Sequence, residues 1–78
     1  MPTVLRVGRF AFRIYTKDHE PPHVHVYDAN GWCRMDIATG AVTKIAGMRP
    51  VDVLQAARIL AAYEELLTQR WEEINGSR

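Results

Sequence analysis

Cysteine is nearly absent from this sequence, since Cys33 is the single one among 78 residues. A lone cysteine forms no disulfide within the chain, and without a second cysteine nearby it makes no zinc knuckle or redox pair. Its expected role is that of a small, half-buried apolar residue. Long apolar runs and a signal-peptide pattern at the N-terminus are also lacking. We therefore expect a cytoplasmic protein that neither spans nor crosses a membrane.

A strong charge of either sign is lacking too, because the net charge is only +1. The balance is uneven: residues 1–49 hold seven basic and four acidic side chains, and residues 50–78 hold three basic and five acidic ones. A chain of 78 residues makes one domain, residues 1–78. It buries only about 60% of the surface that its unfolded form exposes. Such a thin core predicts modest stability or help from a partner.

The first half of the chain has the period of two that is typical of half-buried strands. Phe10 and Phe12 would lie on one face, and Arg9 and Arg13 on the other. Turn residues such as Asn30-Gly31 separate this strand from its neighbours. Those further strands are expected at residues 4–7, 23–27, 32–37 and 42–45.

The second half of the chain is predicted to be helical. Pro50 fits the first turn of a helix, and Asp52 favours the positive end of the helix dipole. Asn75-Gly76 ends the pattern. Between them, apolar residues repeat at spacings of three, four and seven: Val53, Ala57, Leu60, Leu67, Trp71 and Ile74. The predicted fold class is α+β, a small antiparallel sheet of four to five strands packed against one long C-terminal helix.

The opening MPTVLRVGRFAFRIYTKDHEPPHVHV resembles a family of short bacterial proteins described as domain of unknown function number 4160. Its members begin near MPT, run through an R-x-Y strand and carry H-x-PPH-x-HV. The Asp36-Ile37 region and a tryptophan near the end of the helix also match. The resemblance implies a small sheet-plus-helix fold in a cytoplasmic bacterial protein. It also implies frequent pairing with a second small protein encoded alongside, as in toxin-antitoxin modules, and no established activity.

All three histidines lie in the stretch HEPPHVHV, residues 19–26. His23 and His25 would leave the same face of a strand with Cα atoms about 6.5 Å apart. That spacing suits two ligands of one divalent metal ion, with His19, Glu20 or Asp36 as a third, as in catalytic zinc or iron sites. Two alternatives stay open. Either the three histidines form a metal-free acid-base site, or their rings only pack and lock the loop to the sheet.

Glu64 would fall in the middle of the apolar stripe of a continuous helix. A carboxylate buried there without a partner costs several kcal/mol. Either the helix bends near Tyr63 and turns Glu64 outward, or Glu64 reaches an arginine or histidine on the sheet.

Two surfaces are candidates for contacts with other molecules. A basic stripe with one aromatic ring would follow the exposed face of the second strand and suit a phosphate backbone. Its members are Arg9, Arg13, Tyr15 and Lys17. An apolar strip on the outer side of the helix would suit a protein partner or a second copy. Its members are Ile59, Ala62 and Leu66.

Two classes of function follow. The first is one component of a two-gene toxin-antitoxin-like module. It would bind the small protein encoded by the neighbouring gene through the outer helix face, and nucleic acid through the basic strand. The alternative is a small histidine-based or metal-dependent hydrolase or nuclease with His19, His23 and His25 at its centre. The family resemblance favours the first class.

Overall fold

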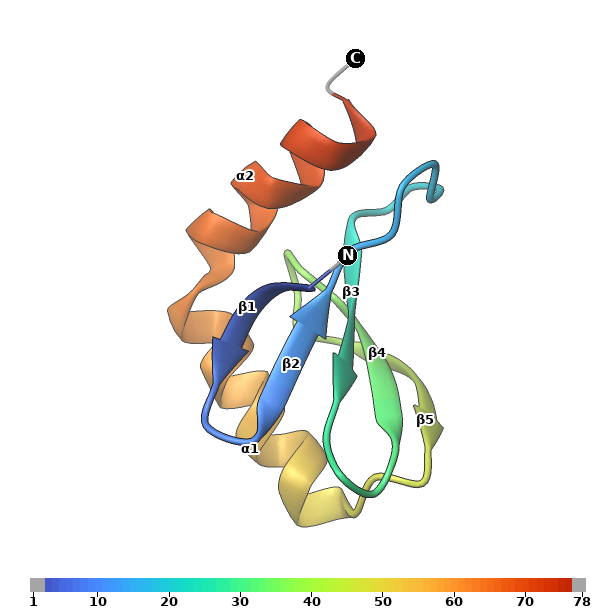
Figure 1. Cartoon of the computed structure of the whole chain (residues 1–78), viewed down its shortest axis with the longest axis vertical. Helices are drawn as coiled ribbons and strands as arrows, with labels where there is room; N and C mark the ends of the chain where they lie inside the picture. Colours follow the sequence, from blue (N-terminus) through green and yellow to red (C-terminus); the bar gives the residue numbers. More distant parts are fainter. Residues whose placement is uncertain (1–2, 77–78) are drawn as a thin grey trace.

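The computed structural model describes residues 3–76, which form a five-stranded antiparallel sheet with two helices packed on one face (Figure 1). The strands follow one another in space as they do in the chain, in the order β1-β2-β3-β4-β5. Their bounds are Thr3–Val7 (β1), Phe10–Arg13 (β2), His23–Tyr27 (β3), Trp32–Asp36 (β4) and Val42–Ala46 (β5). The predicted fold class is confirmed for the sheet, and each predicted strand is present.

Short polar turns set the register of the sheet. Gly8 joins β1 to β2 with a φ of 57°, a conformation that glycine adopts without steric cost. Between β3 and β4, Asp28 Oδ1 accepts hydrogen bonds from the backbone N–H groups of Asn30 and Gly31. These turns place His23 opposite Asp36 and His25 opposite Arg34 on neighbouring strands.

The prediction of one long C-terminal helix is wrong, because the helix is in two pieces. Helix α1 spans Pro50–Ala62 and helix α2 spans Glu64–Asn75. Tyr63, with φ −115° and ψ 21°, separates them. The break exposes Glu64, which a continuous helix would have placed against the apolar core. The predicted bend near Tyr63 is therefore confirmed, and its physical reason is the cost of burying an unpaired carboxylate. The predicted start at Pro50 and end at Asn75 are confirmed.

The core lies between the sheet and the helices. Phe10 and Phe12 of β2 lie on its sheet side, and Leu60 of α1 and Trp71 of α2 close it from the helix side. Cys33 is fully buried in this core rather than half-buried. Burial raises the pKa of its thiol to about 11, so the side chain is a protonated, unreactive thiol.

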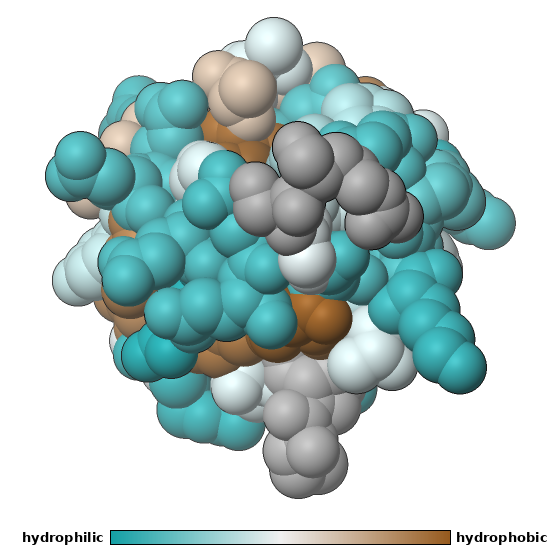
Figure 2. All heavy atoms as spheres, turned by 90° about the horizontal axis from the view of Figure 1, so that it is seen from above, coloured by the Kyte–Doolittle hydropathy of each residue, from teal (hydrophilic) through white to brown (hydrophobic). Residues whose placement is uncertain are grey.

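The helices leave the β5 edge of the sheet uncovered. In Figure 1 they lie beside β1 and β2, and β5 lies on the far side of the sheet. Seen from the C-terminal end, the surface is largely hydrophilic, with hydrophobic side chains visible between the polar ones (Figure 2). Neither helix within residues 3–76 has the length and hydrophobicity that crossing a bilayer requires.

Candidate functional site

The HEPPHVHV stretch forms the end of the β2–β3 loop and nearly all of β3. His23 and His25 lie on one face of β3, as predicted, while Val24 and Val26 point into the core. The three histidine rings are neighbours, because the ring centres of His19 and His25 each lie 5.5 Å from that of His23. His19 is exposed in the loop. The predicted grouping of the three histidines therefore exists in space.

His23 is the buried member, with 4% of its surface exposed. Its Nδ1 lies 2.8 Å from the carbonyl oxygen of Pro21, and its Nε2 lies 2.8 Å from Oδ2 of Asp18. A carbonyl oxygen only accepts hydrogen bonds, so Nδ1 carries a proton. The 2.8 Å between Nε2 and Oδ2 of Asp18 is a hydrogen-bond distance, so the two side chains are in direct contact in this structure.

Asp18 is a site residue that the sequence analysis missed. The C-terminal end of α2 holds it in place, because the Asp18 backbone N–H donates to Oδ1 of Asn75 at 2.9 Å. Trp71, one turn earlier on α2, packs against the His23 ring with 5.2 Å between ring centres. The only sequence signal was a carboxylate directly before His19, and nothing in the pattern indicated that α2 would hold it there.

His25 lies in an aromatic environment on the open face of the sheet. Its ring centre is 4.9 Å from that of Tyr15 and 5.4 Å from that of Trp32. Burial, followed by repulsion from His23, lowers the pKa of His25 below its usual value of 6.5. His25 is therefore neutral at neutral pH. Its Nδ1 is buried and forms no hydrogen bond with any residue of the described chain.

Asp18, His23 and His25 together offer three ligand atoms that all lie within 4.8 Å of one another. Two imidazole nitrogens and one carboxylate oxygen are donors that suit zinc and iron. Among residues 3–76 this is the one group of three or more such side chains close enough to hold a metal ion. The third member is Asp18, rather than His19, Glu20 or Asp36 as expected.

The predicted basic stripe is not a single surface. Strand β2 covers only Phe10–Arg13, so Arg9 lies in the preceding turn and Lys17 in the following loop. Arg9 turns toward α1, where it donates to the carboxylate of Asp52 and to Gln55. The physical reason is that buried Asp52 requires cationic partners, which Arg9 and Arg49 supply.

Arg13 and Tyr15 remain on the open face of the sheet. The guanidinium of Arg13 lies over the Tyr27 ring at 4.2 Å, and the hydroxyl groups of Tyr15 and Tyr27 are 2.9 Å apart. On the same face, Arg34 lies opposite His25, and the ammonium of Lys44 lies 5.7 Å from the Trp32 ring. The open face is therefore aromatic and basic, but it is built from four strands rather than from one.

The predicted apolar strip on the helix is largely covered. Ile59 and Leu66 are half-buried, Ile59 packs against the core, and only Ala62 is exposed. The uncovered apolar side chains lie elsewhere. They are Val42 and Ile45 on β5, Val51 and Leu54 on α1, and Tyr63 between the helices, each between 39% and 62% exposed.

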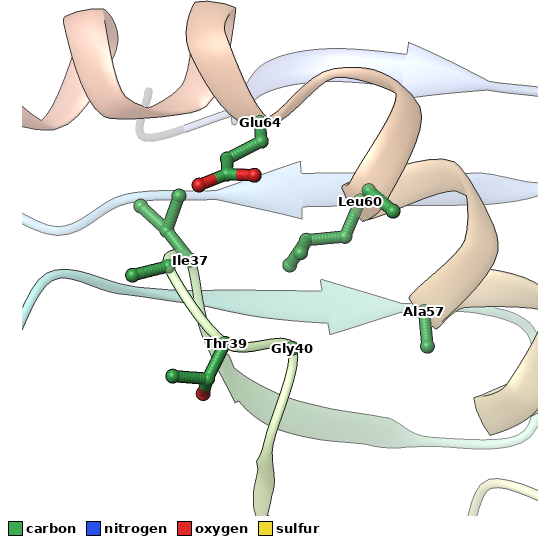
Figure 3. A pocket seen from close by; sticks show the side chains of 8 residues that line it. Ile37, Thr39, Gly40, Ala57, Leu60 and Glu64 are labelled. Carbon is green, nitrogen blue, oxygen red and sulfur yellow. The ribbon is translucent and has the colours of Figure 1, made fainter.

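A pocket of about 330 Å³ lies between the two helices and the β4–β5 turn (Figure 3). Leu60 and Glu64 project from the helices toward this turn. The lining is mainly aliphatic, with the carboxylate of Glu64 as its one charge. The lining residues are Ile37, Ala38, Thr39, Gly40, Ala57, Leu60, Ala61 and Glu64.

Comparison with known proteins identifies a family for most of the chain. The model of the family described as Domain of unknown function (DUF4160) matches residues 10–72, which include the histidine stretch, the sheet from β2 onward and both helices up to Glu72. No curated protein and no solved structure matches the chain.

Proposed function

This chain belongs to the DUF4160 family, and we propose that it is a binding component of a two-gene, toxin-antitoxin-like bacterial module. Its partner is the small protein encoded by the neighbouring gene. The observation that carries the proposal is the uncovered edge of the sheet at β5, where Ile45 is 52% exposed.

Two apolar side chains of β5, Val42 and Ile45, face the region that the helices leave open. Ile45 lies opposite Cys33 and Val42 lies opposite Met35, and directly opposite residues share a face of a sheet. Cys33 and Met35 are fully buried on the helix side. Val42 and Ile45 therefore point to the helix side as well, yet they are 39% and 52% exposed.

Helix α1 supplies the other wall of this open region. Leu54, Ala57 and Ala61 are spaced by three and four residues, so they share one side of α1. Ala57 and Ala61 line the pocket, which places this side toward the β4–β5 turn. Leu54, one turn earlier on the same side, is 54% exposed.

A partner strand suits this site best. Strand β5 is the edge of the sheet, and an edge strand presents unpaired backbone groups that an added strand can bond. Apolar side chains of that partner strand would cover Val42, Ile45 and Leu54 and fill the aliphatic pocket. Main-chain bonds would supply affinity, and the pocket would supply specificity.

Co-expression with the neighbouring gene product tests this proposal. Ile45→Lys and Leu54→Glu should each weaken co-purification at least tenfold, because each places a charge in an apolar contact. Arg6→Glu on the opposite edge strand β1 is the matched control and should leave binding unchanged. Binding that survives both Ile45→Lys and Leu54→Glu would overturn the proposed site. A stable dimer of the chain alone, lost in Ile45→Lys, would replace the partner with a second copy.

Growth measurements test the module itself. Expression of the two genes singly and together should give a growth defect from one gene that the other relieves. Equal growth in all three strains would remove the toxin-antitoxin role while leaving the binding surface to be judged from co-purification.

A second candidate function is contact with single-stranded nucleic acid, and the open face of the sheet favours it. Arg13, Arg34 and Lys44 accompany the rings of Tyr27 and Trp32 there. Cations that follow a backbone and rings that stack on bases are typical of such sites. Three phosphate contacts predict a log-log salt slope of about −2. Arg34→Ala should weaken binding and reduce the slope, whereas Arg58→Ala, exposed on α1, should not.

A further inference from the structure

The histidine site offers more than an ion pair. Asp18 comes from the β2–β3 loop, and His23 and His25 come from β3, yet their ligand atoms all lie within 4.8 Å of one another. Each of the two short contacts of His23 is made to an oxygen that only accepts hydrogen bonds. The buried Nδ1 of His25 has no hydrogen-bond partner in the described chain.

We infer that Asp18, His23 and His25 bind one divalent first-row transition metal ion. A metal ion takes the place of the direct 2.8 Å contact between Nε2 of His23 and Oδ2 of Asp18, and the two atoms move apart to the spacing that a shared ion requires. The same ion gives the unbonded His25 ring a partner. Imidazole and carboxylate donors favour zinc and iron over calcium and magnesium, which take oxygen ligands.

The surroundings of His23 match those of metal-bound histidines. In such sites the ring nitrogen away from the metal usually donates to a carbonyl or carboxylate, which fixes the orientation of the ring. The Nδ1–H of His23 donates to the Pro21 carbonyl at 2.8 Å and leaves Nε2 directed at Asp18. Trp71 packs against the ring and limits its rotation.

The loop that carries Asp18 is held as well. Its backbone N–H donates to Asn75 at 2.9 Å, so α2 fixes the position of the carboxylate. Ligand atoms that share a zinc ion at about 2.0–2.2 Å lie roughly 3–3.5 Å apart. The three ligand atoms lie within 4.8 Å of one another, so the most distant pair must close by up to about 1.5 Å through rotation of the Asp18 or His25 side chain. Three protein ligands leave further positions on the ion for water or a substrate.

The metal site lies away from the β5 edge, so the inference does not depend on the proposed partner. It is tested on the full chain, stripped of metal with a chelator and titrated with Zn²⁺ by calorimetry and with Co²⁺ by visible absorption. One ion per chain should bind, and Co²⁺ should give the absorption bands of a coordinated ion. Asp18→Asn and His25→Ala should each weaken binding by at least about a hundredfold, because the loss of a direct ligand costs no less than the loss of an outer-shell partner.

His19→Ala is the matched control, because its ring belongs to the same row of histidines but is exposed and outside the three-residue cluster. Circular dichroism checks that each variant is folded, so that unfolding is not mistaken for a loss of metal binding. The test does not use His23→Ala, because loss of this buried ring would destabilise the fold. The site is refuted if the unaltered chain binds neither ion at micromolar concentration. It is also refuted if binding persists in Asp18→Asn and His25→Ala, or if only His19→Ala removes it.

Discussion

The ring of Trp71 packs against the ring of His23 with 5.2 Å between their centres, so the last helix of the chain closes over the start of the histidine strand. Both residues are buried, at 2% and 4% exposure. One turn beyond Trp71, Asn75 accepts a hydrogen bond from the loop residue Asp18. The geometry of the histidine site and the docking of α2 are therefore one structural feature, and a change in either should affect the other.

Replacement of Trp71 by Ala should destabilise the fold by about 3–5 kcal/mol, because it empties the largest fully buried side-chain volume in the described core. In a domain of this size, such a loss lowers the melting temperature by well over 10 °C. Thermal unfolding followed by circular dichroism measures it. Glu72→Ala, exposed on the same turn, is the control. A variant that melts with the unaltered protein would contradict the packing described for α2.

His23→Ala and His25→Ala should differ in stability. His23→Ala removes a buried ring and leaves the Pro21 carbonyl and the Asp18 carboxylate without their partner, at a cost of about 2 kcal/mol or more. His25 is half-buried and its Nδ1 makes no hydrogen bond, so His25→Ala should cost about 1 kcal/mol or less. Chemical denaturation in the absence of metal separates them, with exposed His19→Ala as the reference. Equal losses for the two variants would show that burial does not distinguish their roles.

Gly31→Ala should destabilise the β3–β4 turn through a steric clash. A Cβ at this position would lie 2.0 Å from the backbone oxygen of Ala46, which belongs to β5. The backbone must move apart, and overpacking of this kind costs about 1–3 kcal/mol. Ala29→Ser, exposed in the same turn, should cost almost nothing. Hydrogen exchange provides the local test, since faster exchange of the β5 amides is expected in Gly31→Ala alone.

Asp52 should make the stability depend on pH in acid. Hydrogen bonds from Arg49 and then Arg9 lower the pKa of this carboxyl below its ordinary value of 3.8. A carboxyl whose pKa is lower in the folded state stabilises the fold above its unfolded value and loses that contribution as the pH falls through the folded value. The unaltered protein should therefore lose stability as the pH drops below about 4. Asp52→Asn should be less stable at pH 7 and show a smaller loss below pH 4. Parallel pH profiles for the two proteins would contradict this role.

The local structure follows from the order of residues within short segments. Alternation around Phe10 and Phe12 specified a strand with one buried face, and Pro50 and Gly76 marked where the helical region begins and ends. Polar turn residues such as Asn30-Gly31 specified the hairpins. The period of two also placed His23 and His25 on one face. These features depend on neighbours within a few positions, so a pattern is enough to predict them.

Contacts between segments far apart in the chain decided which residues join the site. Asp18 became the third member because Asn75 of α2 bonds the β2–β3 loop and Trp71 of α2 packs against His23. Arg9 left the basic strand because a buried carboxylate on α1 required cationic partners. The helical region broke at Tyr63 because a straight stripe would have buried Glu64. In the first two cases a polar group is satisfied by a residue far away in the chain, and the spacing of residues within one segment carries no record of that requirement. In the third case the sequence left two alternatives for Glu64, and the structure shows the one that keeps its carboxylate out of the core.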